Sequence, residues 1–79
     1  MNEFDKNIGS ILREERKKKG FSQDYVADLV GVSKMHISYW ESGQRSIYAE
    51  RLKAYCKALG ITVQSVFDQM DEKEKANEK

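Results

Sequence analysis

Glycine divides this chain into short segments that have helical periodicity. Four glycines each follow a stretch in which apolar residues recur every three or four positions: Gly20, Gly31, Gly43 and Gly60. Glycine adopts the left-handed conformation beyond a last helical turn at the lowest cost, so these positions predict helix ends. The chain has no proline, and no segment shows the apolar and polar alternation of a half-buried strand. The sequence therefore predicts an all-α fold of five helices.

The predicted helices begin after residues whose side chains can accept from the free N–H groups of a first turn. These caps are Asp5, Ser22, Ser33 and Thr62, and only the fourth start, near residues 46–48, lacks a clean one. The predicted helices cover Lys6–Lys19, Gln23–Val30, Lys34–Ser42, Ala49–Leu59 and a segment from Val63.

Each predicted helix carries an inward stripe of side chains. The stripes comprise Ile8, Ile11, Leu12, Val26, Ala27, Leu29, Val30, Ile37, Trp40, Leu52, Tyr55, Cys56, Leu59, Val66, Phe67 and Met70. Helices this short are not stable alone in water, so the stripes have to share one core.

The length of 79 residues is enough for one domain, assigned to residues 1–70, and too small to enclose a deep active-site cleft as well. Residues 71–79 are charged and have no apolar partner, which predicts a frayed or disordered tail. No catalytic triad, paired carboxylate site or phosphate loop is present, and His36 has no second ligand at metal-binding spacing. We therefore expect a protein that is not an enzyme and uses neither metal nor cofactor.

No apolar run approaches the length of a membrane span, and the single cysteine cannot form an internal disulfide. Residues 1–5 carry charge and no apolar stretch, so we expect no secretory signal. A cytoplasmic location is expected. The net charge of +1 is unevenly distributed, because residues 1–67 hold 11 Lys or Arg against 8 Asp or Glu. A weakly basic domain can bind DNA if its positive charge faces one way.

The segment from Phe21 to Gly43 reads FSQDYVADLVGVSKMHISYWESG. Two short helices separated by Gly31-Val32 form a helix-turn-helix at residues 22–41, and the small Ala27 lets them cross closely. The segment resembles the Cro/C1-type (XRE) family of bacterial and phage DNA-binding repressors. The resemblance extends from Ile8 to Phe67, through Ser22-Gln23, Ala27, Gly31-Val32-Ser33, Ile37-Ser38, Trp40-Glu41, Gly43, Ala58-Leu59-Gly60-Ile61-Thr62 and Val66-Phe67. It implies a compact lambda-repressor-like domain.

The resemblance implies that the helix from Lys34 lies in the major groove of double-stranded DNA. The outward side chains expected to read bases are Lys34, Met35, Ser38 and Tyr39. Expected contacts to the phosphate backbone are Gln23, Ser33, His36, Ser42, Gln44 and Arg45. The alternative is that this is an ordinary solvated face, although an exposed Met and Tyr on a polar face favour a partner.

Two charged residues occupy inward positions. Arg16 lies four residues beyond Leu12 on one stripe, and Glu41 stands beside Trp40 on another. A buried charge requires a partner, and the family resemblance supports an ion pair between Arg16 and Glu41.

These observations predict a sequence-specific transcriptional regulator, expected to be a repressor that binds a pseudo-palindromic operator as a homodimer. The resemblance places the dimer contact near the last helix, where Val63, Val66 and Met70 are the candidates and Phe67 is assigned to the core. The alternative is an antitoxin-type protein-binding module that has a protein partner and also regulates its own operon.

Overall fold

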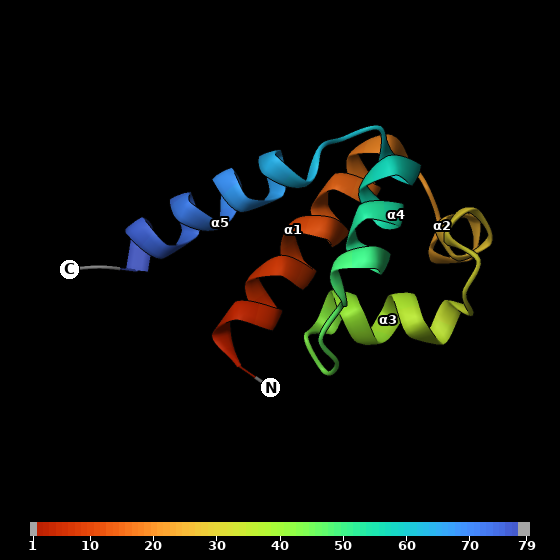
Figure 1. Ribbon diagram of the computed structural model, residues 1–79, viewed down its shortest axis with the longest axis horizontal. Helices are drawn as coiled ribbons and strands as arrows, with labels where there is room; N and C mark the ends of the chain where they lie inside the picture. Colours follow the sequence, from red (N-terminus) through yellow and green to blue (C-terminus); the bar gives the residue numbers. More distant parts are fainter. Residues whose placement is uncertain (1, 78–79) are drawn as a thin grey trace.

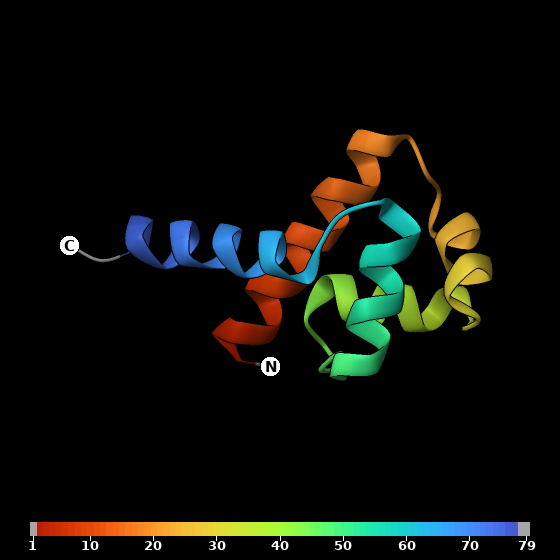
Figure 2. The same cartoon turned by 45° about the horizontal axis from the view of Figure 1, so that its top comes forward.

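The computed structural model describes residues 2–77, and this part of the chain consists of five α-helices with no strand. The helices are α1 (Glu3–Lys19), α2 (Gln23–Val30), α3 (Lys34–Ser42), α4 (Ala49–Leu59) and α5 (Val63–Asn77). Helices α1 and α4 run side by side, α3 packs across α1, and α2 packs on α3 and α4 (Figure 1). Helix α5 lies against α1 and projects from the body of the domain (Figure 2). The predicted all-α fold is confirmed.

The predicted helix ends are confirmed, because the four glycines that follow α1 to α4 have φ angles between 72° and 85°. Three predicted caps are also confirmed: Ser22, Ser33 and Thr62 each accept a hydrogen bond from a backbone N–H three residues later. The start of α4 at Tyr48 has no side-chain cap, as expected.

The predicted cap at Asp5 is wrong. Helix α1 begins at Glu3, and the Asn2 side chain accepts from the N–H of Asp5 at 2.8 Å. Asn2 is as good a capping residue as Asp5, and the earlier start places Glu3 and Asp5 in the first turn, where the helix dipole favours negative charge.

The core is a single cluster to which all five helices contribute. Its buried apolar members are Ile8, Ile11, Leu12, Val26, Ala27, Ile37, Trp40, Leu52, Tyr55, Cys56, Leu59, Val66 and Met70. Leu29, expected inside, is 52% exposed. The buried face of α2 spans Val26, Ala27 and the half-buried Val30, and Leu29 falls outside this arc at 3.6 residues per turn.

The predicted roles of the apolar residues on α5 need correction. Val66 and Met70, expected at a dimer interface, are buried within the domain, whereas Phe67, expected in the core, is 38% exposed. Val66 and Met70 lie one helical turn apart, so both point to the side of α5 that packs on α1, and Phe67 is rotated away from it. Val63, the third interface candidate, is half-buried against the core.

The charged segment after Met70 also differs from expectation. It is helical through Asn77, and residues 78–79 of the expected tail lie outside the described part. Glu, Lys and Ala are good helix formers, and the segment contains neither glycine nor proline, so α5 continues although it has few apolar residues to bury. None of the helices within residues 2–77 is both long enough and apolar enough to cross a membrane.

Candidate nucleic-acid interface

The turn between α2 and α3 is held by backbone and side-chain hydrogen bonds. The N–H groups of Gly31 and Val32 both donate to the carbonyl of Ala27, at 2.8 and 3.0 Å. Ser33 then caps α3 by accepting from the N–H of His36. Because Ala27 is buried and both ends of the turn are bonded, the orientation of α3 relative to α2 is set by this short segment.

One face of α3 is buried and the other is open to solvent. Ile37, Trp40 and Glu41 are buried, as predicted. On the opposite face Lys34, Met35 and Ser38 are exposed and Tyr39 is half-buried. Met35 is 61% exposed, which is unusual for a large apolar side chain in a small domain. The structure thus brings the four predicted base-reading residues together on one accessible surface.

Arg45 lies beside this surface. The loop after α3 turns back so that the N–H of Gln44 donates to the Tyr39 carbonyl at 3.0 Å. The guanidinium carbon of Arg45 lies 5.0 Å from the centre of the Tyr39 ring, a cation–π contact. Arg45 and Tyr39 line a hollow of about 140 Å³ together with Ser33, Met35 and His36. The stacking holds a positive charge at the edge of the exposed face of α3.

The other predicted phosphate contacts are close to α3, but the side chains of four of them also make intramolecular hydrogen bonds. Ser33 caps the helix, and its Oγ lies 2.8 Å from Nδ1 of the exposed His36. Ser42 donates to the Tyr39 carbonyl at 3.2 Å. Gln23 is half-buried and its Nε2 donates to Glu41 at 3.1 Å, while Gln44 is exposed.

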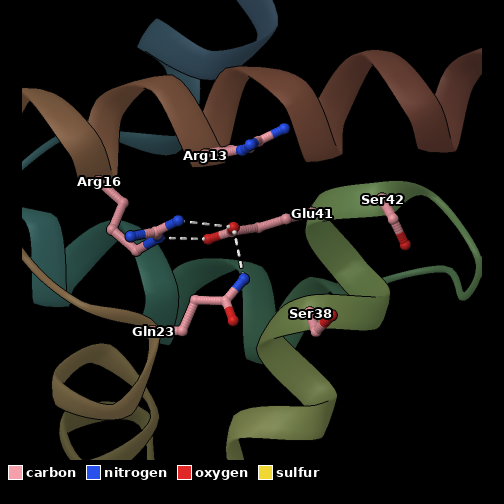
Figure 3. A pocket seen from close by; sticks show the side chains of 6 residues that line it. All are labelled: Arg13, Arg16, Gln23, Ser38, Glu41 and Ser42. Atoms are coloured by element: carbon pink, nitrogen blue, oxygen red, sulfur yellow. Dashed lines mark hydrogen bonds and ion pairs between the residues drawn. The ribbon is translucent and has the colours of Figure 1, made fainter.

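The predicted ion pair between Arg16 and Glu41 is present and bidentate. Arg16 Nε and Nη2 donate to the two oxygens of Glu41 at 2.7 and 3.0 Å (Figure 3). Arg16 Nη1 donates to the carbonyl of Phe21 at 2.7 Å. The side chains are only 9% and 3% exposed. Arg16 thereby connects α1 to the end of α3 and to the segment that leads into α2.

Two partners of Glu41 were not predicted from the sequence. The hydroxyl of Tyr55, on α4, donates to Glu41, and Gln23 donates from the start of α2. A buried tyrosine hydroxyl needs a hydrogen-bond partner, so the placement of Tyr55 on the inward stripe of α4 was the signal available in the sequence. Glu41 is the point at which side chains from α1, α2 and α4 meet the recognition-helix candidate α3.

This network shifts the pKa of each titratable member. Burial acts to raise the pKa of Glu41, but the hydrogen bonds from Arg16, Tyr55 and Gln23 outweigh it and lower the pKa below the ordinary value. The hydrogen bond to Glu41 raises the pKa of Arg16. Burial and the hydrogen bond to Glu41 raise the pKa of Tyr55. All three side chains therefore keep one protonation state near neutral pH.

We expect the network to make the domain sensitive to acid. A carboxylate whose pKa is lowered on folding stabilises the protein above its unfolded pKa, here 4.5, and this stability is lost as the pH falls through the lowered folded value. A double variant, Arg16→Met with Glu41→Leu, lacks this contribution. Urea unfolding at pH 7 and at a pH below 4.5 should show that the wild type loses more stability between the two pH values than the double variant does. Equal losses in the two proteins would contradict this role of Glu41.

Two observations concern metal binding and thiol chemistry in the described residues. Residues 2–77 contain no group of three His, Cys, Asp or Glu side chains arranged to hold a metal ion. Cys56 is 2% exposed, and burial raises the pKa of its thiol to about 11, which suits a core residue rather than a nucleophile.

The chain matches known regulators over most of its length. Residues 12–66 match the helix-turn-helix family. The competence pilus inhibition repressor of Acinetobacter baylyi is 33% identical over 61 residues, which cover 77% of this chain and 56% of that protein. The chain spans only 56% and 62% of the lengths of two curated relatives that it matches.

Solved structures of known regulators are similar to this chain. The clp gene regulator ClgR from C. glutamicum has a TM-score of 0.86 at 27% identity, covering 92% of this chain and 95% of that one. The P22 c2 repressor, in complex with a synthetic operator, has a TM-score of 0.70 at 34% identity, covering 75% of this chain and 89% of that one. With its turn at Gly31, its buried ion pair and its exposed α3, the chain belongs to the helix-turn-helix family of the Cro/C1 type.

Proposed function

We propose that this protein is a sequence-specific DNA-binding transcriptional regulator that represses by occupying an operator. The observation that carries the proposal is the exposed face of α3. Lys34, Met35 and Tyr39 lie on this face, and the opposite face of the helix is buried and held by the hydrogen bonds between Arg16 and Glu41. A rigid helix with exposed polar and apolar side chains on one face matches the requirements for reading base edges in the major groove.

The residues of this face offer several kinds of base contact. The Lys34 ammonium donates to guanine O6 and N7, and the hydroxyls of Ser38 and Tyr39 pair with either donors or acceptors. Met35 packs against a thymine methyl group. Arg45, oriented by the Tyr39 ring, binds a backbone phosphate and sets the register of α3. Ser33, His36, Ser42, Gln44 and Gln23 remain candidates for further backbone contacts.

The relatives favour regulation over the antitoxin alternative. The Acinetobacter baylyi relative is named a repressor, and the P22 c2 repressor was solved with an operator. Repression is the simpler action for a domain of this size, because occupation of a promoter requires no further surface.

The first test is selection of bound sites from a random DNA pool, followed by binding measurements on the selected operator and on random duplex. Lys34→Ala should cost about 1 to 3 kcal/mol on the operator and leave binding to random DNA almost unchanged. Arg45→Ala should weaken binding to the operator and to random DNA. It should also reduce the salt dependence of binding by the amount expected for the loss of about one phosphate contact. Lys57→Gln, in the last turn of α4 and remote from α3, serves as the control for loss of one positive charge.

Failure of the pool to yield a common site would refute sequence-specific binding. Equal losses on operator and random DNA for Lys34→Ala and Arg45→Ala would refute the base-reading role of α3.

We further propose that the protein acts as a homodimer through α5. Phe67 is 38% exposed and lies one turn from Val63, which is half-buried against the core, whereas Val66 and Met70 are buried within the domain. An exposed Phe with an apolar neighbour on a projecting helix favours burial in an isologous contact. Two copies related by a twofold axis would engage half-sites about 34 Å apart.

Phe67→Glu should therefore convert a dimer into a monomer and weaken operator binding, while Ala76→Glu on the same helix should do neither. Sedimentation velocity gives the assembly state, and titration of the operator gives the number of chains per duplex. One chain per duplex for the wild type, or an unchanged dimer for Phe67→Glu, would contradict this interface.

A further inference from the structure

A cleft of about 260 Å³ opens between α1 and α3, on the side of α3 away from Arg45. Arg13 of α1 stands above it, Ser38 and Ser42 of α3 form one side, and Gln23 lies on the other (Figure 3). The paired side chains of Arg16 and Glu41 form its floor. The cleft therefore borders directly on the proposed base-reading face.

The charge of this cleft comes from Arg13. Arg16 and Glu41 neutralise each other at the floor. Arg13 is exposed, and within residues 2–77 it takes part in neither of the ion pairs, which join Arg16 to Glu41 and Lys18 to Glu15. The remaining walls are hydroxyl and amide groups, and no further acidic side chain lines the cleft. A guanidinium beside neutral polar groups provides the chemistry that binds a phosphate oxygen.

Arg13 and Arg45 lie beside opposite edges of the exposed face of α3. Lys34, Ser38 and Glu41 lie along the edge of α3 that borders the cleft, and Tyr39 and His36 lie along the edge next to Arg45. A helix in the major groove has a phosphate backbone on each side. One guanidinium is thus available for each strand.

We propose that Arg13 binds a phosphate of the DNA strand opposite the one contacted by Arg45, so that the two arginines position α3 from both sides of the groove. This inference rests on the proposed DNA-binding function. Arg13 is a positioning residue, since phosphate contacts set register and carry no sequence information themselves.

The test compares Arg13→Gln, Arg13→Lys and the control Lys57→Gln in the full chain, on the selected operator and on random duplex, between 50 and 200 mM salt. Loss of one phosphate contact should lower affinity about eightfold at 0.1 M salt and make the slope of log K against log salt shallower by about 0.9. Arg13→Gln should show both effects equally on the two DNAs. Arg13→Lys should restore the slope, because the charge remains, and the melting temperature of each variant should match the wild type.

Three results would overturn the assignment of Arg13: a slope for Arg13→Gln equal to that of Lys57→Gln, failure of Arg13→Lys to restore it, or a loss of affinity that follows a lowered melting temperature. If the wild type selects an operator and Arg45→Ala weakens binding while Arg13→Gln does not, the proposed function stands and only the phosphate contact of Arg13 is wrong. If the wild type selects no operator, the proposed function itself fails.

Discussion

Glu41→Ala is expected to destabilise the domain by about 3 to 5 kcal/mol, which approaches the total stability of a protein at the lower end of the range of about 5 to 15 kcal/mol. The substitution leaves the Arg16 guanidinium buried without its carboxylate and removes the acceptor of the Tyr55 hydroxyl. Each loss imposes the desolvation cost of an unpaired polar group. Circular dichroism at 37 °C should show a largely unfolded chain.

Restoration of stability distinguishes a buried network from two surface charges. The double variant Arg16→Met with Glu41→Leu removes both charges and keeps similar volume, so it should be more stable than the sum of the two single changes predicts. Additivity of Arg16→Met and Glu41→Leu in urea unfolding would show that the two residues are independent.

Tyr55 supplies a further test within the same network. In the wild type, Tyr55→Phe removes a hydrogen bond to a charged acceptor and should cost about 1.5 to 3 kcal/mol. In the double variant the hydroxyl has lost that acceptor, so Tyr55→Phe should be neutral or stabilising. The same cost in both backgrounds would contradict the role of Glu41 as the acceptor.

Gly9→Ala is expected to destabilise the domain by about 3 kcal/mol, at the upper end of the cost of overpacking. A Cβ on Gly9 would lie 2.2 Å from the carbonyl oxygen of Trp40 and 2.7 Å from that of Glu41. Both are backbone atoms and cannot rotate away, so α1 and α3 would have to separate. Separation would also stretch the contact between Arg16 and Glu41.

Whether Gly9→Ala stabilises or destabilises the domain shows whether α3 contacts α1 at Gly9. In an exposed helix interior, Gly→Ala stabilises by about 0.5 to 1 kcal/mol, so Gly9→Ala would be a stabilising change if α3 were not in contact. Gly60→Ala is the control, since a Cβ there meets nothing within 4 Å and the cost comes only from its φ of 72°. Urea unfolding should rank Gly9→Ala well below Gly60→Ala, and a Gly9→Ala variant as stable as the wild type would refute the close crossing.

Local signals in the sequence predicted the elements of this fold well. The glycines after α1 to α4, the caps at Ser22, Ser33 and Thr62, and the turn at Gly31 act within a few residues of their own position, so the sequence contains nearly all the information that they require. The one wrong cap, at Asp5, arose because Asn2 offers an equivalent local signal three residues earlier.

The candidate site was predicted in part for the same reason. The outward face of α3 follows from helical periodicity once Ile37 and Trp40 are assigned to the core, and the structure exposes Lys34, Met35 and Ser38 as expected. The partner of Arg16 was predicted because Arg16 and Glu41 both occupy inward positions and the family resemblance supports a pair between them. The sequence did not indicate that Arg45 stacks on Tyr39, since the path of the loop that brings them together depends on packing.

By itself the sequence determined where α2, α3 and α4 begin and end, which faces are broadly apolar, and which helix presents the candidate reading surface. Only the tertiary structure decided which of several apolar residues on a helix is buried, as with Phe67 and Met70, because that depends on the direction from which α1 packs on α5. It also decided that Gly9 touches the backbone of α3, that Tyr55 bonds to Glu41, and that Arg13 lines a cleft together with Ser38 and Ser42. These contacts join residues far apart in the chain, and no local signal records the angle and distance at which two helices cross.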